Sequence, residues 1–111
     1  MNWLGILAAL SGALAIGAGA FGAHGASDHA AGLLKTGGQY QLVHAVAALL
    51  AMQLGARGPA WAFVIGAALF AGSIYALAEG APRWVGPITP VGGLVMIAGW
   101  AWLAWTLGRA V

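Results

Sequence analysis

The chain has 111 residues, of which 62% are hydrophobic and 5% are charged, with a net charge of +2. A water-soluble domain carries about a quarter charged residues, so this composition excludes a water-facing surface, and no basic run indicates nucleic-acid binding. The absence of cysteine excludes disulfides, thiolate metal sites and thiol catalysis. The charged residues leave four charge-free stretches, 1–27, 36–56, 58–78 and 84–108. Each is long enough for a helix that crosses a bilayer, which takes about 20 residues.

The first predicted helix covers residues 2–23, with Asn2 as its N-cap. Glycine and alanine dominate it, and small residues let membrane helices pack closely. The stretch is longer than the apolar core of a secretory signal, and no Lys or Arg precedes it. We therefore expect it to be a retained span.

Residues 24–35 form the longest polar connection, in which Ser27 or Asp28 is expected to cap a short helix lying in the membrane interface. The second predicted helix covers residues 36–54 and begins with a polar turn around Tyr40. His44 lies four residues later on the same face, about 12 Å from the start of this helix. An ionisable side chain at that depth is a functional candidate, with a neutral histidine bonded to a nearby carbonyl or hydroxyl as the alternative.

The third and fourth predicted helices cover residues 60–78 and 90–107, with Thr89 as the N-cap of the last one. Short connections make successive helices antiparallel. The prediction is therefore an all-α, integral membrane, up-down-up-down four-helix bundle that forms a single transmembrane domain over residues 1–111.

The predicted topology sorts the charged residues into two sides. Arg57 and Arg109 lie with both termini, whereas Lys35 and Arg83 lie on the loop side with the two acidic residues. With the terminal amine, the side of the termini carries one more positive group. This balance favours cytoplasmic termini in a bacterial inner membrane.

Polar side chains gather on the loop side, where connections 24–35 and 79–89 meet. Helix N-termini attract anions, and the glycine pairs at 37–38 and 92–93 would let a head group approach the backbone, although glycine also serves helix packing. We expect no catalytic residue, metal site or cofactor. The candidate ligand-binding residues are His24, Tyr40, His44, Ser73, Tyr75, Arg83 and Thr89.

Three functions remain open from the residues alone. The first is a non-enzymatic membrane protein whose polar pocket binds a lipid-like or quinone-like ligand or a partner helix. The second is a small-solute or proton pathway, which requires His44, Tyr75 and Glu79 to face one aqueous cavity. The third is a haem or metal-binding protein that uses His24 and His44. The bilayer is the expected partner, and a homo-oligomer or a larger membrane complex is compatible with the small size.

Four segments of the chain resemble a known family. They are residues 19–24, 39–45, 69–75 and 88–93, with the sequences GAFGAH, QYQLVHA, LFAGSIY and ITPVGG. Their order and spacing are similar to the domain-of-unknown-function 423 family, whose animal relatives are called transmembrane protein 256. The resemblance covers nearly the whole chain. It implies a small integral membrane protein with four predicted helices, and it implies no activity.

Overall fold

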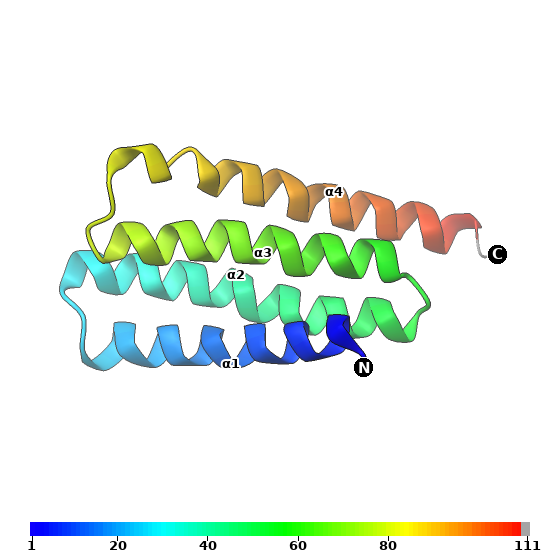
Figure 1. The fold of residues 1–111 in the computed structure, drawn as a ribbon, viewed down its shortest axis with the longest axis horizontal. Helices are drawn as coiled ribbons and strands as arrows, with labels where there is room; N and C mark the ends of the chain where they lie inside the picture. Colours follow the sequence, from blue (N-terminus) through cyan, green and yellow to red (C-terminus); the bar gives the residue numbers. More distant parts are fainter. Residues whose placement is uncertain (110–111) are drawn as a thin grey trace.

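The computed structural model describes residues 1–109, which form four long antiparallel helices (Figure 1). The N-terminus and the end of the last helix lie at the same end of the bundle, and the described residues include no strand. The prediction of an all-α membrane bundle is confirmed. The helices are α1 (Trp3–His24), α2 (Asp28–Gln53), α3 (Arg57–Ala78) and α4 (Ile88–Arg109), and a 3-10 turn, η1 (Arg83–Val85), precedes α4.

Three segments within residues 1–109 are long and apolar enough to cross a membrane: α1, α3 and the stretch Arg83–Arg109. The more polar α2 runs between α1 and α3 (Figure 1). Because its neighbours cross the bilayer on either side, α2 crosses with them, and its polar residues Gln41 and His44 are buried in the interior. The bundle is 49 Å long, enough for the bilayer core of about 30 Å with both ends in the interfaces.

The start of α2 differs from the prediction. The Ser27 hydroxyl accepts a hydrogen bond from the Ala30 amide at 3.3 Å, and Asp28 occupies the first turn, where its charge complements the helix dipole. The helix then continues without a break to Gln53. The expected short interfacial helix is therefore wrong, because it is the first two turns of α2. As a result Tyr40 lies at the middle of α2 and not near its start.

The other helix ends are largely as expected. Asn2 caps α1, since its side-chain oxygen accepts a hydrogen bond from the Gly5 amide at 3.0 Å. The last helix begins at Ile88, so Thr89 lies inside it and the expectation that Thr89 is the N-cap is wrong. Pro59 and Pro90 lie in the first turns of their helices. A proline has no backbone N–H, and this costs nothing there because the N–H groups of a first turn have no acceptor within the helix.

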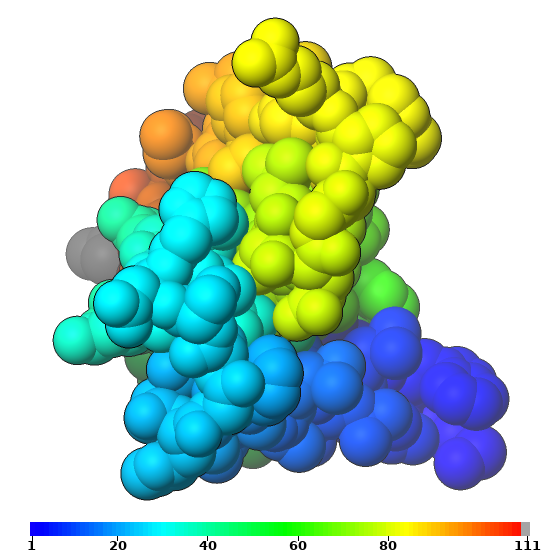
Figure 2. All heavy atoms as spheres, turned by 90° about the vertical axis from the view of Figure 1, so that its left-hand side faces the viewer, coloured from blue at the N-terminus to red at the C-terminus, as the bar shows by residue number. Residues whose placement is uncertain are grey.

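The helices stack in chain order, α1 on α2, α2 on α3 and α3 on α4, with a smaller contact between α1 and α3. Figure 2 shows this stack from the loop end, with the α1–α2 connection below the α3–α4 connection. Seven of the ten buried residues of α2 recur at alternating spacings of four and three, the period of closely packed antiparallel helices. This seam consists of Ala30, Leu34, Gly37, Gln41, His44, Ala48 and Ala51.

Glycine lets the helix backbones approach one another. A Cβ at Gly38 would lie 3.0 Å from the Ala15 carbonyl oxygen, and one at Gly92 would lie 2.7 Å from the Gly66 carbonyl oxygen. The pair Gly37–Gly38 lies inside α2, so the expectation that it stands at a helix N-terminus is wrong. These glycines bring α1 against α2 and α3 against α4.

Candidate functional site

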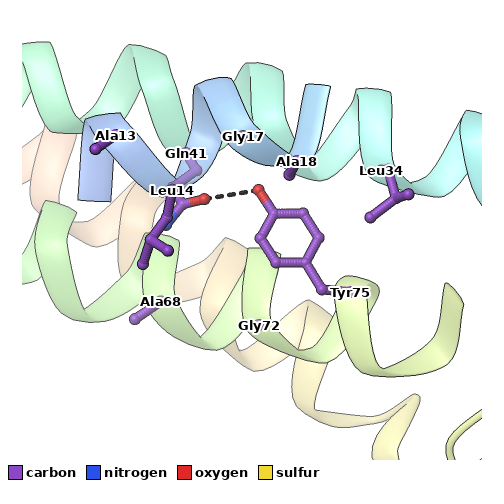
Figure 3. Close-up of a pocket in the computed structure, with 9 residues that line it drawn as sticks. All are labelled: Ala13, Leu14, Gly17, Ala18, Leu34, Gln41, Ala68, Gly72 and Tyr75. Carbon is purple, nitrogen blue, oxygen red and sulfur yellow. Dashed lines mark hydrogen bonds between the residues drawn. The ribbon is translucent and has the colours of Figure 1, made fainter. Parts of the chain in front are cut away.

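A buried amide joins the first three helices at mid-depth. The Gln41 side chain of α2 is 5% exposed, and its Nε2 donates to the Ser11 hydroxyl of α1 at 3.1 Å. Its Oε1 accepts a hydrogen bond from the Tyr75 hydroxyl of α3 at 2.6 Å, as Figure 3 shows. Because both ends of the amide are paired, this polar group is satisfied in the apolar interior.

A second polar contact joins α2 to α4. The indole nitrogen of Trp100 donates to Nε2 of His44 at 3.0 Å, and Nδ1 of His44 lies 2.7 Å from the Tyr40 carbonyl oxygen. An indole N–H can only donate, so Nε2 accepts, and Nδ1 carries the proton and donates to the carbonyl. His44 is therefore a neutral imidazole with both nitrogens bonded. A neutral, hydrogen-bonded histidine was the alternative to a ligand-binding role in the sequence analysis.

Aromatic rings surround His44. Phe63 and Trp100 approach its ring edge-on, with centroids 5.6 and 5.9 Å away, and the Tyr40 ring is stacked at 6.5 Å. The Tyr40 ring also packs against Phe70 at 5.0 Å. The face of α2 that meets α4 therefore presents an aromatic lining with one buried polar group.

Two side chains at the middle of α2 are more exposed than these. Gln39 is exposed, and Tyr40 is 49% exposed. Neither the Gln39 amide nor the Tyr40 hydroxyl takes part in the side-chain hydrogen bonds found within residues 1–109. The hydrocarbon around them has no water to pair with, so an unpaired polar group costs several kcal/mol there.

The remaining candidate residues lie closer to the loop end. Ser73 donates to the Phe70 carbonyl at 2.9 Å, so the Thr89 hydroxyl is the donor in the 2.5 Å contact between Ser73 and Thr89. This pair joins α3 to the first turn of α4. Arg83 and His24 are exposed, in η1 and at the last residue of α1. The seven candidates thus lie in separate places and do not form one loop-side pocket.

Two grooves flank the central helices. One, of about 500 Å³, lies between α1 and α3 with Gln41 and Tyr75 in its lining (Figure 3). The other, of about 270 Å³, lies between α2 and α4 over Phe70 of α3. Its lining residues are Tyr40, His44, Phe70, Gly93, Met96, Ile97 and Trp100. A shallow depression along Gln39 and Val43 adjoins it. Both grooves lie at the depth of the hydrocarbon.

The two histidines proposed as a haem or metal pair do not meet. His24 ends α1 beside the start of α2, whereas His44 lies sixteen residues into α2, about 24 Å along its axis. The residues 1–109 contain no group of three or more His, Cys, Asp or Glu side chains placed to hold a metal ion. Both nitrogens of His44 are already engaged, so this chain's residues do not fit an axial haem ligand there.

Sequence reasoning did not place Ser11, Gln41 or Trp100 among the candidate residues. The sequence did contain a signal for Ser11 and Gln41. Each is fifteen residues from residue 26 in the α1–α2 turn, so in an antiparallel helix pair the two side chains lie at the same depth. The Trp100 contact has no comparable signal, since α2 and α4 are not consecutive. The position of one indole ring there depends on how α3 separates the two helices.

The helix lengths, the apolar exterior and the paired polar interior define a small integral membrane protein of four helices. A family model described as "Protein of unknown function (DUF423)" matches residues 18–93. The chain belongs to this family, as the four sequence segments predicted.

Curated relatives extend the match to most of the chain. The UPF0382 inner membrane protein YgdD of Escherichia coli K12 is 39% identical over 107 residues, covering 86% of this chain and 82% of its own. A UPF0382 membrane protein of Haemophilus influenzae is 38% identical over 109 residues, covering 89% and 88%. The UPF0382 membrane protein SAB0533 of Staphylococcus aureus is 35% identical over 108 residues, covering 88% of each chain. No solved structure matches.

Proposed function

We propose that this membrane protein is a non-enzymatic binding protein for a quinone-like amphiphile, held in the groove between α2 and α4. The observation that carries the proposal is the Tyr40 hydroxyl, an unpaired donor in an aromatic groove at the middle of a membrane-spanning helix. A carbonyl oxygen on a flat ring would accept this hydrogen bond while the ring stacks on the aromatic side chains.

The depth of the groove selects the class of ligand. Phospholipid head groups stay at the interfaces, about 15 Å from the midplane, because the hydrocarbon core is about 30 Å thick. A quinone head is uncharged and carries its acceptors on an apolar ring with a long apolar tail. It therefore suits a groove whose lining is apolar except for Tyr40 and the His44–Trp100 pair.

The two alternative functions have less support. Tyr75 lines the α1–α3 groove and His44 lines the α2–α4 groove, whereas Glu79 is exposed just beyond the end of α3. A proton or solute pathway requires these three side chains to share one aqueous cavity. The haem or metal alternative requires a free histidine nitrogen, and His44 has both of its nitrogens bonded.

Two glycines offer a matched test of the binding groove. A Cβ at Gly93 would meet only the Phe70 ring, at 3.9 Å, and a Cβ at Gly72 would meet nothing within 4 Å. Leucine at Gly93 fills the α2–α4 groove, and leucine at Gly72 fills the α1–α3 groove, since each glycine lines its own groove. The two variants carry the same chemical change at opposite faces.

The assay measures retention of a short-tail ubiquinone by the purified protein in nanodiscs, with bound quinone quantified after extraction. We expect Gly93→Leu to lower retention at least tenfold, Tyr40→Phe to lower it several-fold, and Gly72→Leu to leave it unchanged. Equal retention by Gly93→Leu and Gly72→Leu, or no saturable retention by the unaltered protein, would contradict the proposal.

We also infer that both termini face the cytoplasm and that the protein resides in a bacterial inner membrane. The terminal amine, Arg57 and Arg109 outnumber Lys35 and Arg83 by one positive group. The printed name of the E. coli relative describes an inner membrane protein. A C-terminal fusion to green fluorescent protein should fluoresce, and one to alkaline phosphatase should be inactive. The opposite pair of results contradicts this orientation.

A further inference from the structure

The outer face of α2 carries a second regular seam besides the buried one. Val43, Val46 and Leu50 are each more than half exposed, and with Gln39 and Gln53 they recur at spacings of four, three, four and three. This period places the five side chains along one line that a second helix can follow over four turns. Within residues 1–109 no other helix covers this line, because α1 and α3 pack on other faces of α2 and α4 reaches α2 through the Trp100–His44 contact.

Gln39 lies at the most outward position of this face of α2. It lines one depression along α2, with Tyr40 and Val43, and another against α1, with Gly38 and Leu42. Gln39 is exposed, so its amide faces the surrounding hydrocarbon. At the middle of a helix of 26 residues, it is too far from either interface to reach water.

The chemistry of an amide identifies its partner. A glutamine side chain carries a donor and an acceptor, so two such side chains at the same depth pair with each other. Two copies related by a two-fold axis along the membrane normal place Gln39 against the Gln39 of the other copy. The same operation pairs Val43 and Val46 with their own equivalents, and a single polar residue in an apolar seam fixes register in this way.

We propose that a second copy of this chain packs on the outer face of α2, in the same membrane orientation, through the seam of Gln39, Val43, Val46 and Leu50. Lys35 does not obstruct this contact, since it lies over α1 beside Gly19 and its long side chain extends toward the loop-side interface. The seam borders the α2–α4 groove at the depression lined by Gln39, Tyr40 and Val43. The dimer is nevertheless tested by measurements that involve no quinone.

The dimer is tested by crosslinking in native membranes, which the absence of native cysteine makes direct. Val43→Cys and Val46→Cys are compared with Leu14→Cys on α1 and Leu94→Cys on α4, which are each 65% exposed. We expect disulfide-linked dimer to form at least tenfold faster at the two α2 positions. If the two copies were inverted relative to each other, with their α2 helices aligned at the midpoint, residue 46 would face residue 35 of the other copy. The two copies of residue 46 would then lie about 16 Å apart along the helix axis. Rapid crosslinking through Val46→Cys therefore also reports the orientation.

The role of the amide is tested by energy transfer between labelled copies diluted in liposomes. We expect Gln39→Ala to weaken dimerisation about tenfold, from the loss of the paired amides, and Gln39→Asn to weaken it less. Gln53→Ala is the matched control, since it removes the same side chain from the wet end of the same face. Circular dichroism checks that each variant is folded.

Three outcomes would overturn the proposal. They are equal crosslinking at all four cysteine positions, an unchanged dimerisation constant for Gln39→Ala, and capture of a different protein by Val43→Cys in place of the second copy.

Discussion

Replacing Gln41 with leucine tests whether the buried amide holds the first three helices together. Leucine is close in size, so the change removes the hydrogen bonds to Ser11 and Tyr75 with little loss of packing. Side-chain hydrogen bonds between membrane helices contribute about 0.6 kcal/mol on average and up to about 1.7 kcal/mol. Two such bonds give an expected loss of about 1–3 kcal/mol in the free energy of unfolding.

A double-mutant cycle isolates the individual bonds. Tyr75→Phe removes the 2.6 Å bond alone, and Ser11→Ala removes the 3.1 Å bond alone. Each should couple to Gln41→Leu by about 0.5–1.5 kcal/mol, because the second change removes a partner that is already lost. Unfolding in mixed micelles, followed by circular dichroism, supplies the four free energies.

The control for this cycle is Ser73→Ala. Ser73 bonds Phe70 and Thr89 and shares no partner with Gln41, so its effect should add to that of Gln41→Leu. Coupling below about 0.3 kcal/mol for both Tyr75→Phe and Ser11→Ala would refute the reasoning, since contacts that share a partner do not behave independently.

Three further predictions concern packing, tautomer and capping. Gly92→Ala should lower the melting temperature sharply, whereas Gly93→Ala should leave it nearly unchanged. The reason is that a Cβ at residue 92 would clash with the α3 backbone and a Cβ at residue 93 would not. Similar melting temperatures for the two variants would contradict the close contact between the helices. Nitrogen-15 NMR of labelled protein should show the neutral Nδ1–H form of His44, and Trp100→Phe should shift its Nε2 resonance; an Nε2–H signal would contradict the Trp100 bond. Ser27→Ala should cost about 1 kcal/mol of unfolding free energy through loss of the α2 cap, and no loss would show that the cap does not matter.

The fold was predictable because its signal is compositional. Charge-free stretches of sufficient length, separated by polar and Gly/Pro-rich connections, predicted the number and direction of the helices. Helix starts were less predictable, as α2 shows. Ser27 was recognised as a possible cap, but the polar residues of 24–35 suggested a connection up to Lys35, which the packing of α2 between α1 and α3 overrides.

The candidate residues were only partly interpretable from sequence. Their types and helices could be listed, but their neighbours depend on the rotation of each helix about its axis. An all-round apolar helix gives no hydrophobic face from which to read that rotation. Thus His44 was recognisable as unusual, whereas its bond to Trp100 across two helices was not.

The polarity of α2 has a consequence for membrane insertion. Polar and charged residues make a helix a poor substrate for entry into lipid on its own, and α2 carries Asp28, Lys35, Gln39, Gln41 and His44. When α2 leaves the ribosome only Ser11 is available to it, because Tyr75 and Trp100 follow it in the chain and have not yet emerged. We therefore expect α2 to remain in the insertion machinery beside α1 until α3 and α4 arrive, so that for this chain entry into the membrane and tertiary folding are a single event.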